Sequence, residues 1–127
     1  MKRINISSGS AWETKVGYSR AVKVNNVIEV AGTTATHNGK VVGKDDPYLQ
    51  TRFILEIISD VLKGLGSGME QVVRTRMYVV DIKYWEEIGR AHAEFFSDVK
   101  PAATMVEVKS LIDPDLLVEI EVTAIII

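Results

Sequence analysis

The last eleven residues alternate between two kinds of side chain, and this pattern constrains the fold more than any other. The even positions are apolar: Val118, Ile120, Val122, Ala124 and Ile126. The odd positions are mixed: Leu117, Glu119, Glu121, Thr123 and Ile125. Because successive side chains of a strand point to opposite faces of a sheet, residues 117–127 are predicted to form a strand whose even face meets helices. The mixed face would expose large apolar side chains if it were bare, so we expect a partner surface there.

Turn signals near the start of the chain predict antiparallel strands. Runs rich in Val, Ile and Thr at 19–24 and 27–35 are separated only by Asn25-Asn26, and Asn tolerates the positive φ of a tight hairpin. His37-Asn38-Gly39 is a second hairpin signal, with 40–42 as the returning strand. We expect these three antiparallel strands to open the fold. They follow a short strand at 2–6 and a polar loop at 7–17 that leads to Tyr18.

Two helices are predicted from apolar residues that recur at steps of three and four. The first begins at Asp46-Pro47, because Asp can cap free N–H groups and Pro loses no hydrogen bond at the first helical position. Its stripe comprises Leu49, Phe53, Ile54, Ile57, Ile58, Val61, Leu62 and Leu65, and Gly64, Gly66 and Gly68 end it. The second helix runs from Tyr84 to Ser97 with Asp81 as a plausible cap, and Tyr84 and Trp85 are expected to pack.

Between and after the helices, two further strands complete the pattern. Residues 71–80 alternate, with Val73, Thr75, Met77 and Val79 on one face and Arg74, Arg76 and Tyr78 on the other. A strand at 104–109 follows Pro101 and is joined to the last strand by a turn at 113–115. This order predicts an α+β fold, a mainly antiparallel mixed sheet with two helices on one face, and we read residues 1–127 as a single domain.

Composition excludes several classes of site. The chain has no cysteine, so disulfides and thiolate chemistry are ruled out, and its two histidines, His37 and His92, lie too far apart with no acidic partners to predict a metal site. Fifteen Lys and Arg against 17 Asp and Glu give a formal net charge of −2, which disfavours a nucleic-acid partner. The sequence has no uninterrupted apolar run of about 18 residues, the length that would predict a membrane span, so a cytoplasmic protein is expected.

Four short motifs, in the same order and spread over nearly the whole chain, resemble segments of the RidA/YjgF family. The family's Gly-Pro-Tyr-Ser-x-Ala, Val-Ser-Gly-Gln, Pro-Ala-Arg-x-x-Val-x-Val and Ile-Glu-Ile-Glu-Ala segments are matched by residues 17–22, 30–33, 101–108 and 118–122. The resemblance implies a chorismate-mutase-like fold, a homotrimer, and three clefts between subunits. Family members hydrolyse reactive enamines and imines such as 2-aminoacrylate there, giving 2-oxo acids and ammonia without a metal or organic cofactor.

The same resemblance assigns candidate site residues. Tyr18 and Glu119 match catalytic positions, with the Tyr18 hydroxyl placing ligand or water and Glu119 acting as general base. Gly32, Thr33 and Met105 lie in the matching motifs and are expected to contact the ligand. Ala103 stands where the family has the arginine that grips the substrate carboxylate, and Gly89 stands where it has a cleft asparagine, so the usual 2-aminoacrylate activity is in doubt.

Three alternatives stay open on the sequence alone. Arg76, with Arg74, could replace the lost cation, although an intersubunit salt bridge is the simpler role for this pair. Glu119 could be a solvated or interface-paired carboxylate, sharing its face with Glu121. The chain could therefore be an enamine or imine deaminase, or a trimer that binds or senses a small molecule such as a 2-imino or 2-oxo acid without turnover.

Overall fold

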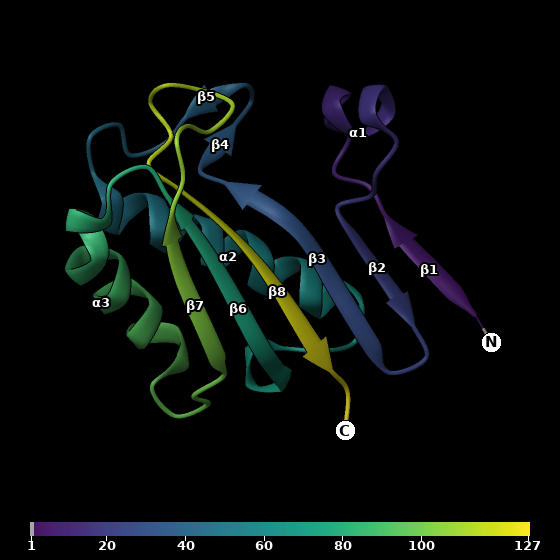
Figure 1. The fold of residues 1–127 in the computed structure, drawn as a ribbon. Coiled ribbons are helices and arrows are strands. Elements are labelled where there is room, and N and C mark those ends of the chain that lie inside the picture. Colours follow the sequence, from purple (N-terminus) through teal and green to yellow (C-terminus); the bar gives the residue numbers. More distant parts are fainter. Residues whose placement is uncertain (1) are drawn as a thin grey trace.

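The computed structural model describes residues 2–127, and it contains a six-stranded sheet with its two long helices packed on one side (Figure 1). The sheet has the order β1-β2-β3-β8-β6-β7, and β4 and β5 form a separate two-stranded ribbon. The elements are β1 (Arg3–Ile6), α1 (Ala11–Val16), β2 (Ala21–Val24), β3 (Val27–Thr34), β4 (Thr36–His37), β5 (Lys40–Val41), α2 (Pro47–Gly64), the 3-10 helices η1 (Met69–Gln71) and η2 (Ile82–Tyr84), β6 (Val72–Val79), α3 (Trp85–Phe96), β7 (Ala102–Glu107) and β8 (Val118–Ile125). The predicted α+β class is confirmed.

The core lies between the sheet and the two long helices, as the alternation of the last strand predicts. Val118, Ile120, Val122 and Ala124 of β8 are fully buried against the helix layer, and the odd positions of β8 lie half-buried on the open face. Helix α2 contributes its buried stripe to the same core, and Asp46 caps it by accepting a hydrogen bond from the Leu49 N–H at 3.0 Å. Only one face of the sheet is therefore covered by this chain's own helices (Figure 1).

Strand pairing is mixed, with one parallel neighbour. Strand β7 runs parallel to β6 at one edge of the sheet, whereas β1–β2, β2–β3, β3–β8 and β8–β6 are antiparallel. The register of β3 against β8 shifts between Val30 and Thr33, which inserts a bulge around Gly32. The Asn25-Asn26 hairpin is confirmed, with Asn25 at φ 54°.

Two predictions about the first third of the chain were wrong. Residues 7–17 are not all loop, because Ser10 caps a short helix, α1, which Gly17 ends at φ 88°. Residues 40–42 do not add a third strand to the main sheet. Lys40 and Val41 pair only with β4, so this hairpin forms its own ribbon beyond the end of β3.

Three side chains lie differently from the sequence prediction. Val73 is exposed because the register of β6 against β8 shifts between Val72 and Arg74, and Val72 takes the buried position instead. Leu49 is 43% exposed, since the buried stripe of α2 runs through Gln50 and Thr51 at this turn. Trp85 is 57% exposed and does not pack as expected, whereas Tyr84 packs against the core.

In the described part of the chain, no helix combines the length and the apolar character that crossing a membrane requires.

Candidate functional site

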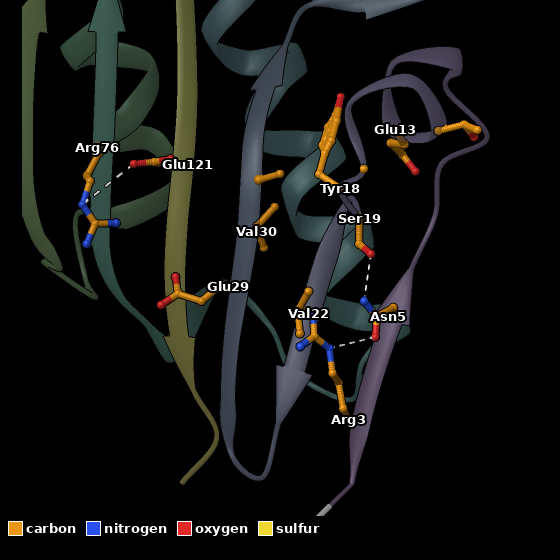
Figure 2. Close-up of a pocket in the computed structure, with 13 residues that line it drawn as sticks. Arg3, Asn5, Glu13, Tyr18, Ser19, Val22, Glu29, Val30, Arg76 and Glu121 are labelled. Atoms are coloured by element: carbon orange, nitrogen blue, oxygen red, sulfur yellow. Dashed lines mark hydrogen bonds and ion pairs between the residues drawn. The ribbon is translucent and has the colours of Figure 1, made fainter.

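A groove of about 770 Å³ lies on the open face of the sheet, beside α1. Figure 2 shows side chains from β1, β2, β3, β6 and β8 around it. Tyr18 stands at the end near α1, and Arg76 and Glu121 lie across the groove on β6 and β8. The lining is mostly polar, with Glu29 on β3 between these two ends. This face therefore offers a hollow in which charged side chains of both signs meet.

The Tyr18 end of the groove is held in place by a buried carboxylate in α1. Glu13 is only 5% exposed. Its oxygens accept hydrogen bonds from the hydroxyl of Ser7 at 2.8 Å, from the Ser8 N–H at 3.2 Å and from the Ser8 hydroxyl. Burial raises the pKa of Glu13, but the Ser8 and Ser7 hydrogen bonds outweigh it and leave this pKa below its ordinary value. The Glu13 carbonyl accepts the Tyr18 N–H at 3.0 Å, so the same residue fixes the backbone of Tyr18.

Glu119 lies two residues along β8 from the Glu121 that lines the groove. Burial raises the pKa of Glu119 above its ordinary value, while the positive charge of Arg20 opposes this shift and Glu121 adds to it. Its carboxylate accepts no hydrogen bond and forms no ion pair with any of residues 2–127. A half-buried carboxylate without a partner is suited to take or give a proton.

Gly32 makes room for this carboxylate. A Cβ at Gly32 would overlap an oxygen of Glu119 and would lie 3.1 Å from its Cδ. The β3 bulge thus brings the backbone of Gly32 directly against the carboxyl group. Neighbouring Thr33 is buried on the helix side of the sheet, and its hydroxyl donates to the Ala31 carbonyl at 2.9 Å. The structure therefore places Gly32, but not the Thr33 side chain, beside Glu119.

Arg20 is the residue of this site that sequence reasoning missed. Its Nη2 donates to the Gly32 carbonyl at 2.6 Å, and its Cζ lies 5.8 Å from the centroid of the Tyr18 ring. Arg20 stands inside the Gly17–Val22 motif, two residues after Tyr18. Its charge next to a tyrosine in a predicted site motif was a signal that could have been used. Its contact with Gly32 depends on the bulge in β3, which sequence alone did not reveal.

Arg76 and Glu121 belong to a second cluster on the same face. The Tyr78 hydroxyl donates to Glu121 Oε1 at 2.7 Å, and this hydrogen bond, together with burial, raises the pKa of Tyr78. Arg76 Nε lies 3.9 Å from the same oxygen. Because Glu121 already has these partners, it is less available than Glu119 for proton transfer. Arg74 is also engaged, donating to the Thr104 hydroxyl at 2.6 Å.

The other expected ligand contacts lie on the helix side of the sheet. Ala103 pairs with buried Thr75, and Met105 pairs with buried Met77, so both alternate onto the face that the helices cover. Glu119 pairs with Tyr78 on the open face. Gly89 lies on α3, beside a hollow that Trp85, Glu86, Glu87 and Arg90 complete. Within one chain, the structure brings Tyr18, Gly32, Arg76 and Glu119 to the open face and leaves Gly89, Ala103 and Met105 on the other side.

The two histidines lie apart in the fold. His92 Nε2 is 2.9 Å from the Thr75 hydroxyl and its ring lies against Phe96, and burial lowers the pKa of His92. His37 is exposed in the β4–β5 ribbon. Over residues 2–127, no group of three or more His, Asp and Glu side chains has a geometry that could hold a metal ion.

Comparison with known proteins places the chain in a family. The pattern of the family described as Endoribonuclease L-PSP matches residues 8–126. An uncharacterized protein of Streptomyces coelicolor is 38% identical over 119 residues, which cover 94% of this chain and 89% of the relative. A RutC family protein of Pyrococcus abyssi is 35% identical over 109 residues, covering 84% of each chain.

Solved structures agree with this assignment. Rv2704 of Mycobacterium tuberculosis, described as a member of the YjgF/YER057c/UK114 family, has a TM-score of 0.90 and 46% identity, covering 98% of this chain and 100% of its own. A putative endoribonuclease L-PSP of Entamoeba histolytica has a TM-score of 0.86 and 28% identity, covering 98% and 100%. The chain therefore belongs to the RidA/YjgF family, the family of Endoribonuclease L-PSP.

Proposed function

We propose that this chain works as a homotrimer that binds a small metabolite in clefts between its subunits and hydrolyses an enamine or imine there. The observation that carries the proposal is Glu119, a carboxylate with a raised pKa and no partner among residues 2–127, packed against Gly32. The Gly32 carbonyl accepts from Arg20, which lies over the Tyr18 ring. Such a carboxylate needs a reason to be held away from water. Proton transfer to and from a bound molecule is the reason that this arrangement supports best.

The reaction itself requires only water and proton transfers. Water adds to the carbon of the C=N bond, and Glu119 takes a proton from it as the C–O bond forms. The nitrogen takes up that proton to give an amino alcohol, and it then receives the proton of the newly added hydroxyl group. The C–N bond breaks as the C=O bond forms, so ammonia leaves and a 2-oxo compound remains. An enamine reaches the same path after its terminal carbon accepts a proton, which makes it an imine. Nothing is oxidised or reduced, and Tyr18 is assigned to orient the ligand or the water.

Assembly is proposed because the expected contacts lie on two sides of the sheet. Ala103 and Met105 belong to β7, which is an edge strand, and they alternate away from the face that carries Glu119. Two subunits packed side by side could bring the β7 edge of one against the Glu119 face of the next. The resemblance to RidA/YjgF proteins supports a trimer with three such clefts, and a net charge of −2 favours a small-molecule ligand over nucleic acid. A cytoplasmic location stays a prediction.

A second function is favoured by the side chains missing from the helix-side wall. Ala103 is exposed and Gly89 has no side chain, so neither supplies the charge or the amide that the family pattern has there. A trimer that binds or senses a metabolite without turnover would need no such anchor. The two functions differ in whether Glu119 changes a reaction rate.

Turnover of 2-aminoacrylate distinguishes the deaminase from the trimer that binds a metabolite without turnover. The compound is generated from serine by a dehydratase, and release of the 2-oxo acid is followed with wild type, Glu119→Gln and Ala103→Arg. We expect wild type to exceed the rate in buffer and Glu119→Gln to fall by roughly 100-fold or more, on the scale of a lost general base. The matched control is Glu121→Gln, whose carboxylate is engaged by Tyr78 and which should retain most of the rate.

A wild-type rate equal to that in buffer would remove the deaminase reading for this substrate. If Ala103→Arg then gained activity, the native chain would be a binder that has lost the substrate anchor. Equal rates for wild type and Glu119→Gln, both above buffer, would move the catalytic role away from Glu119.

A further inference from the structure

We propose that Arg20 is the residue that binds the negative charge of the ligand, taking over the role of the cation that is absent at position 103. The inference rests on the proposed small-molecule cleft and specifies its chemistry: a small ligand with a carboxylate or similar planar anion at one end and an N–H or carbonyl group at the other. It also moves the anion contact from the β7 edge to the face that carries Glu119.

The backbone of Arg20 is fixed between two strands. Its N–H donates to the Ile6 carbonyl at 2.7 Å, and its carbonyl accepts the Ala31 N–H at 3.0 Å. The residue directly precedes β2, so its position is tied to both β1 and β3. A guanidinium that starts from such a rigid backbone loses less freedom when it binds an anion than one on a loop.

Most donors of this guanidinium are uncommitted. Arginine has five N–H donors, and among residues 2–127 only Nη2 of Arg20 makes a hydrogen bond, to the Gly32 carbonyl at 2.6 Å. Nε is buried and has no partner in the described chain. A buried donor without a partner is costly, so Nε holds the guanidinium in an environment that favours an acceptor close to it. Nη1 also makes no hydrogen bond within residues 2–127, and the half-buried side chain leaves such a terminal donor as the group that would meet an anion.

Both charged groups of the site converge on Gly32. Arg20 binds its carbonyl, and the Glu119 carboxyl group lies where a Cβ would be. The two charges are close enough for Arg20 to act on the ionisation of Glu119, yet they form no ion pair. A cation and a carboxylate held near each other without contact fit a ligand whose anionic end meets Arg20 and whose reacting nitrogen or oxygen meets Glu119. The centroid of the Tyr18 ring lies 5.8 Å from the guanidinium carbon.

The two other arginines of this face are less suitable. Arg76 lies 3.9 Å from Glu121, and Arg74 donates to Thr104 across to β7. Among the arginines of this face, Arg20 is the one whose positive charge lowers the pKa of Glu119 against the effect of burial. Arg76 pairs with Glu121, two residues along β8 from Glu119. An anchor on Arg76 would therefore hold the ligand beside Glu121 and not beside Glu119. Arg20 is therefore the cation that can hold a ligand against Glu119.

The test measures charge selectivity as well as affinity. Binding of pyruvate and of its neutral isostere pyruvamide is measured by calorimetry or ligand-observed NMR on the full chain. We expect wild type to prefer pyruvate, and Arg20→Gln to lose this preference by weakening pyruvate about 10- to 100-fold while pyruvamide changes little. Arg76→Gln is the matched control and should keep the preference. The ratio of the two affinities is the decisive value, because a purely structural Arg20 would weaken both ligands alike.

Several outcomes would overturn the proposal. These are equal affinities in wild type, equal losses for both ligands in Arg20→Gln, or loss of the preference in Arg76→Gln instead. If Arg20→Gln does not fold, Arg20→Lys tests the anion anchor in its place. Its single ammonium cannot serve both the Gly32 carbonyl and a forked carboxylate, so pyruvate should weaken and pyruvamide should not. Unchanged pyruvate binding in Arg20→Lys would count against the anchor.

Failure of this inference is separable from failure of the proposed function. If the trimer forms and 2-aminoacrylate turnover depends on Glu119 while Arg20→Gln leaves KM unchanged, the enzyme stands and the anchor lies elsewhere. If wild type prefers pyruvate through Arg20 but shows no turnover, the anchor stands in a binding protein.

Discussion

At the scale of single residues, Gly32 and Glu119 illustrate how the backbone sets up chemistry. A glycine in the β3 bulge lets the carboxyl group approach the chain more closely than any other residue would allow. This approach takes the carboxylate partly out of water, which disfavours its charged form. The molecule therefore keeps at this position a group that is less stable when ionised than it would be on the surface.

The first prediction concerns the stability of Glu119→Gln. Since the pKa of Glu119 is higher in the folded than in the unfolded chain, the stabilisation by its protonated form is complete below the unfolded pKa and is lost as pH rises through the folded pKa. Gln has no proton to lose. We therefore expect Glu119→Gln to match wild type at acid pH and to be more stable than wild type at neutral pH, by urea unfolding.

Glu121→Gln serves as control for this prediction. Its carboxylate already accepts the Tyr78 hydroxyl and lies near Arg76, so its replacement should bring no gain at neutral pH. A Glu119→Gln variant that is less stable than wild type at neutral pH would show that Glu119 has a stabilising partner, and the proton-transfer role would lose its physical basis.

At the scale of elements, α1 is the part of the fold that most depends on one side chain. It has only six residues, which is too short to be stable alone, and Glu13 ties it to Ser7 and Ser8. We predict that Glu13→Ala lowers the free energy of unfolding by about 1–3 kcal/mol, since it removes the hydrogen bonds to a buried carboxylate that tie α1 to Ser7 and Ser8. Amide hydrogen exchange should rise across residues 7–18 more than elsewhere, and the Tyr18 end of the groove should loosen with it.

The same contact predicts acid sensitivity of α1. The pKa of Glu13 is lowered in the folded chain, so its stabilisation is present above the unfolded pKa and is lost as pH falls through the folded value. Exchange in residues 7–18 of wild type should therefore increase at acid pH, and Glu13→Ala should abolish this dependence. Thr14→Ala, an exposed change in the same helix, is the control and should leave the profile as in wild type. An unchanged pH profile in Glu13→Ala would contradict the role of the carboxylate.

Elements with strong periodicity could be predicted from the sequence, and those held by side chains could not. The alternation of 117–127 and the steps of three and four in α2 and α3 reflect burial directly. In contrast, α1 has no apolar stripe, and it forms because Ser10 and Gly17 cap it and Glu13 is buried. Gln50 is a similar case. Its side chain is fully buried and accepts the Leu117 N–H at 2.8 Å, which fixes the start of β8 from a helix 67 residues away in the chain.

The candidate site was predictable only where a short motif carried it. Tyr18, Gly32 and Glu119 came from family resemblance, and the structure places all three on the open side of the sheet. The part played by Arg20 depends on a bulge between Val30 and Thr33, and a shift in strand register leaves no clear trace in one sequence. Ala103 and Met105 face the helix side because they pair with Thr75 and Met77 of β6. Alternation along one strand does not show which of its residues share a face with Glu119 on β8, so this placement could not be predicted.

At the scale of the whole molecule, the sheet is covered on one face and has β7 exposed along one edge (Figure 1). An uncovered edge strand is a ready partner for another chain. The open face also carries half-buried apolar residues such as Val22 and Ile125 among its charges. Both features favour association, and the proposed trimer would bring together the expected ligand contacts that lie on the two sides of the sheet.

The last prediction tests that association with two substitutions of equal starting exposure. Val106 on β7 and Leu49 on α2 are both 43% exposed, but Val106 pairs with Tyr78 on the open face and Leu49 lies in the helix layer. We expect wild type to sediment as a trimer at micromolar concentration. A lysine at Val106 would have to be desolvated in the interface, so Val106→Lys should shift the chain toward monomers, whereas Leu49→Lys should stay assembled. A trimeric Val106→Lys would move the interface away from β7, and a monomeric wild type would remove the intersubunit cleft altogether.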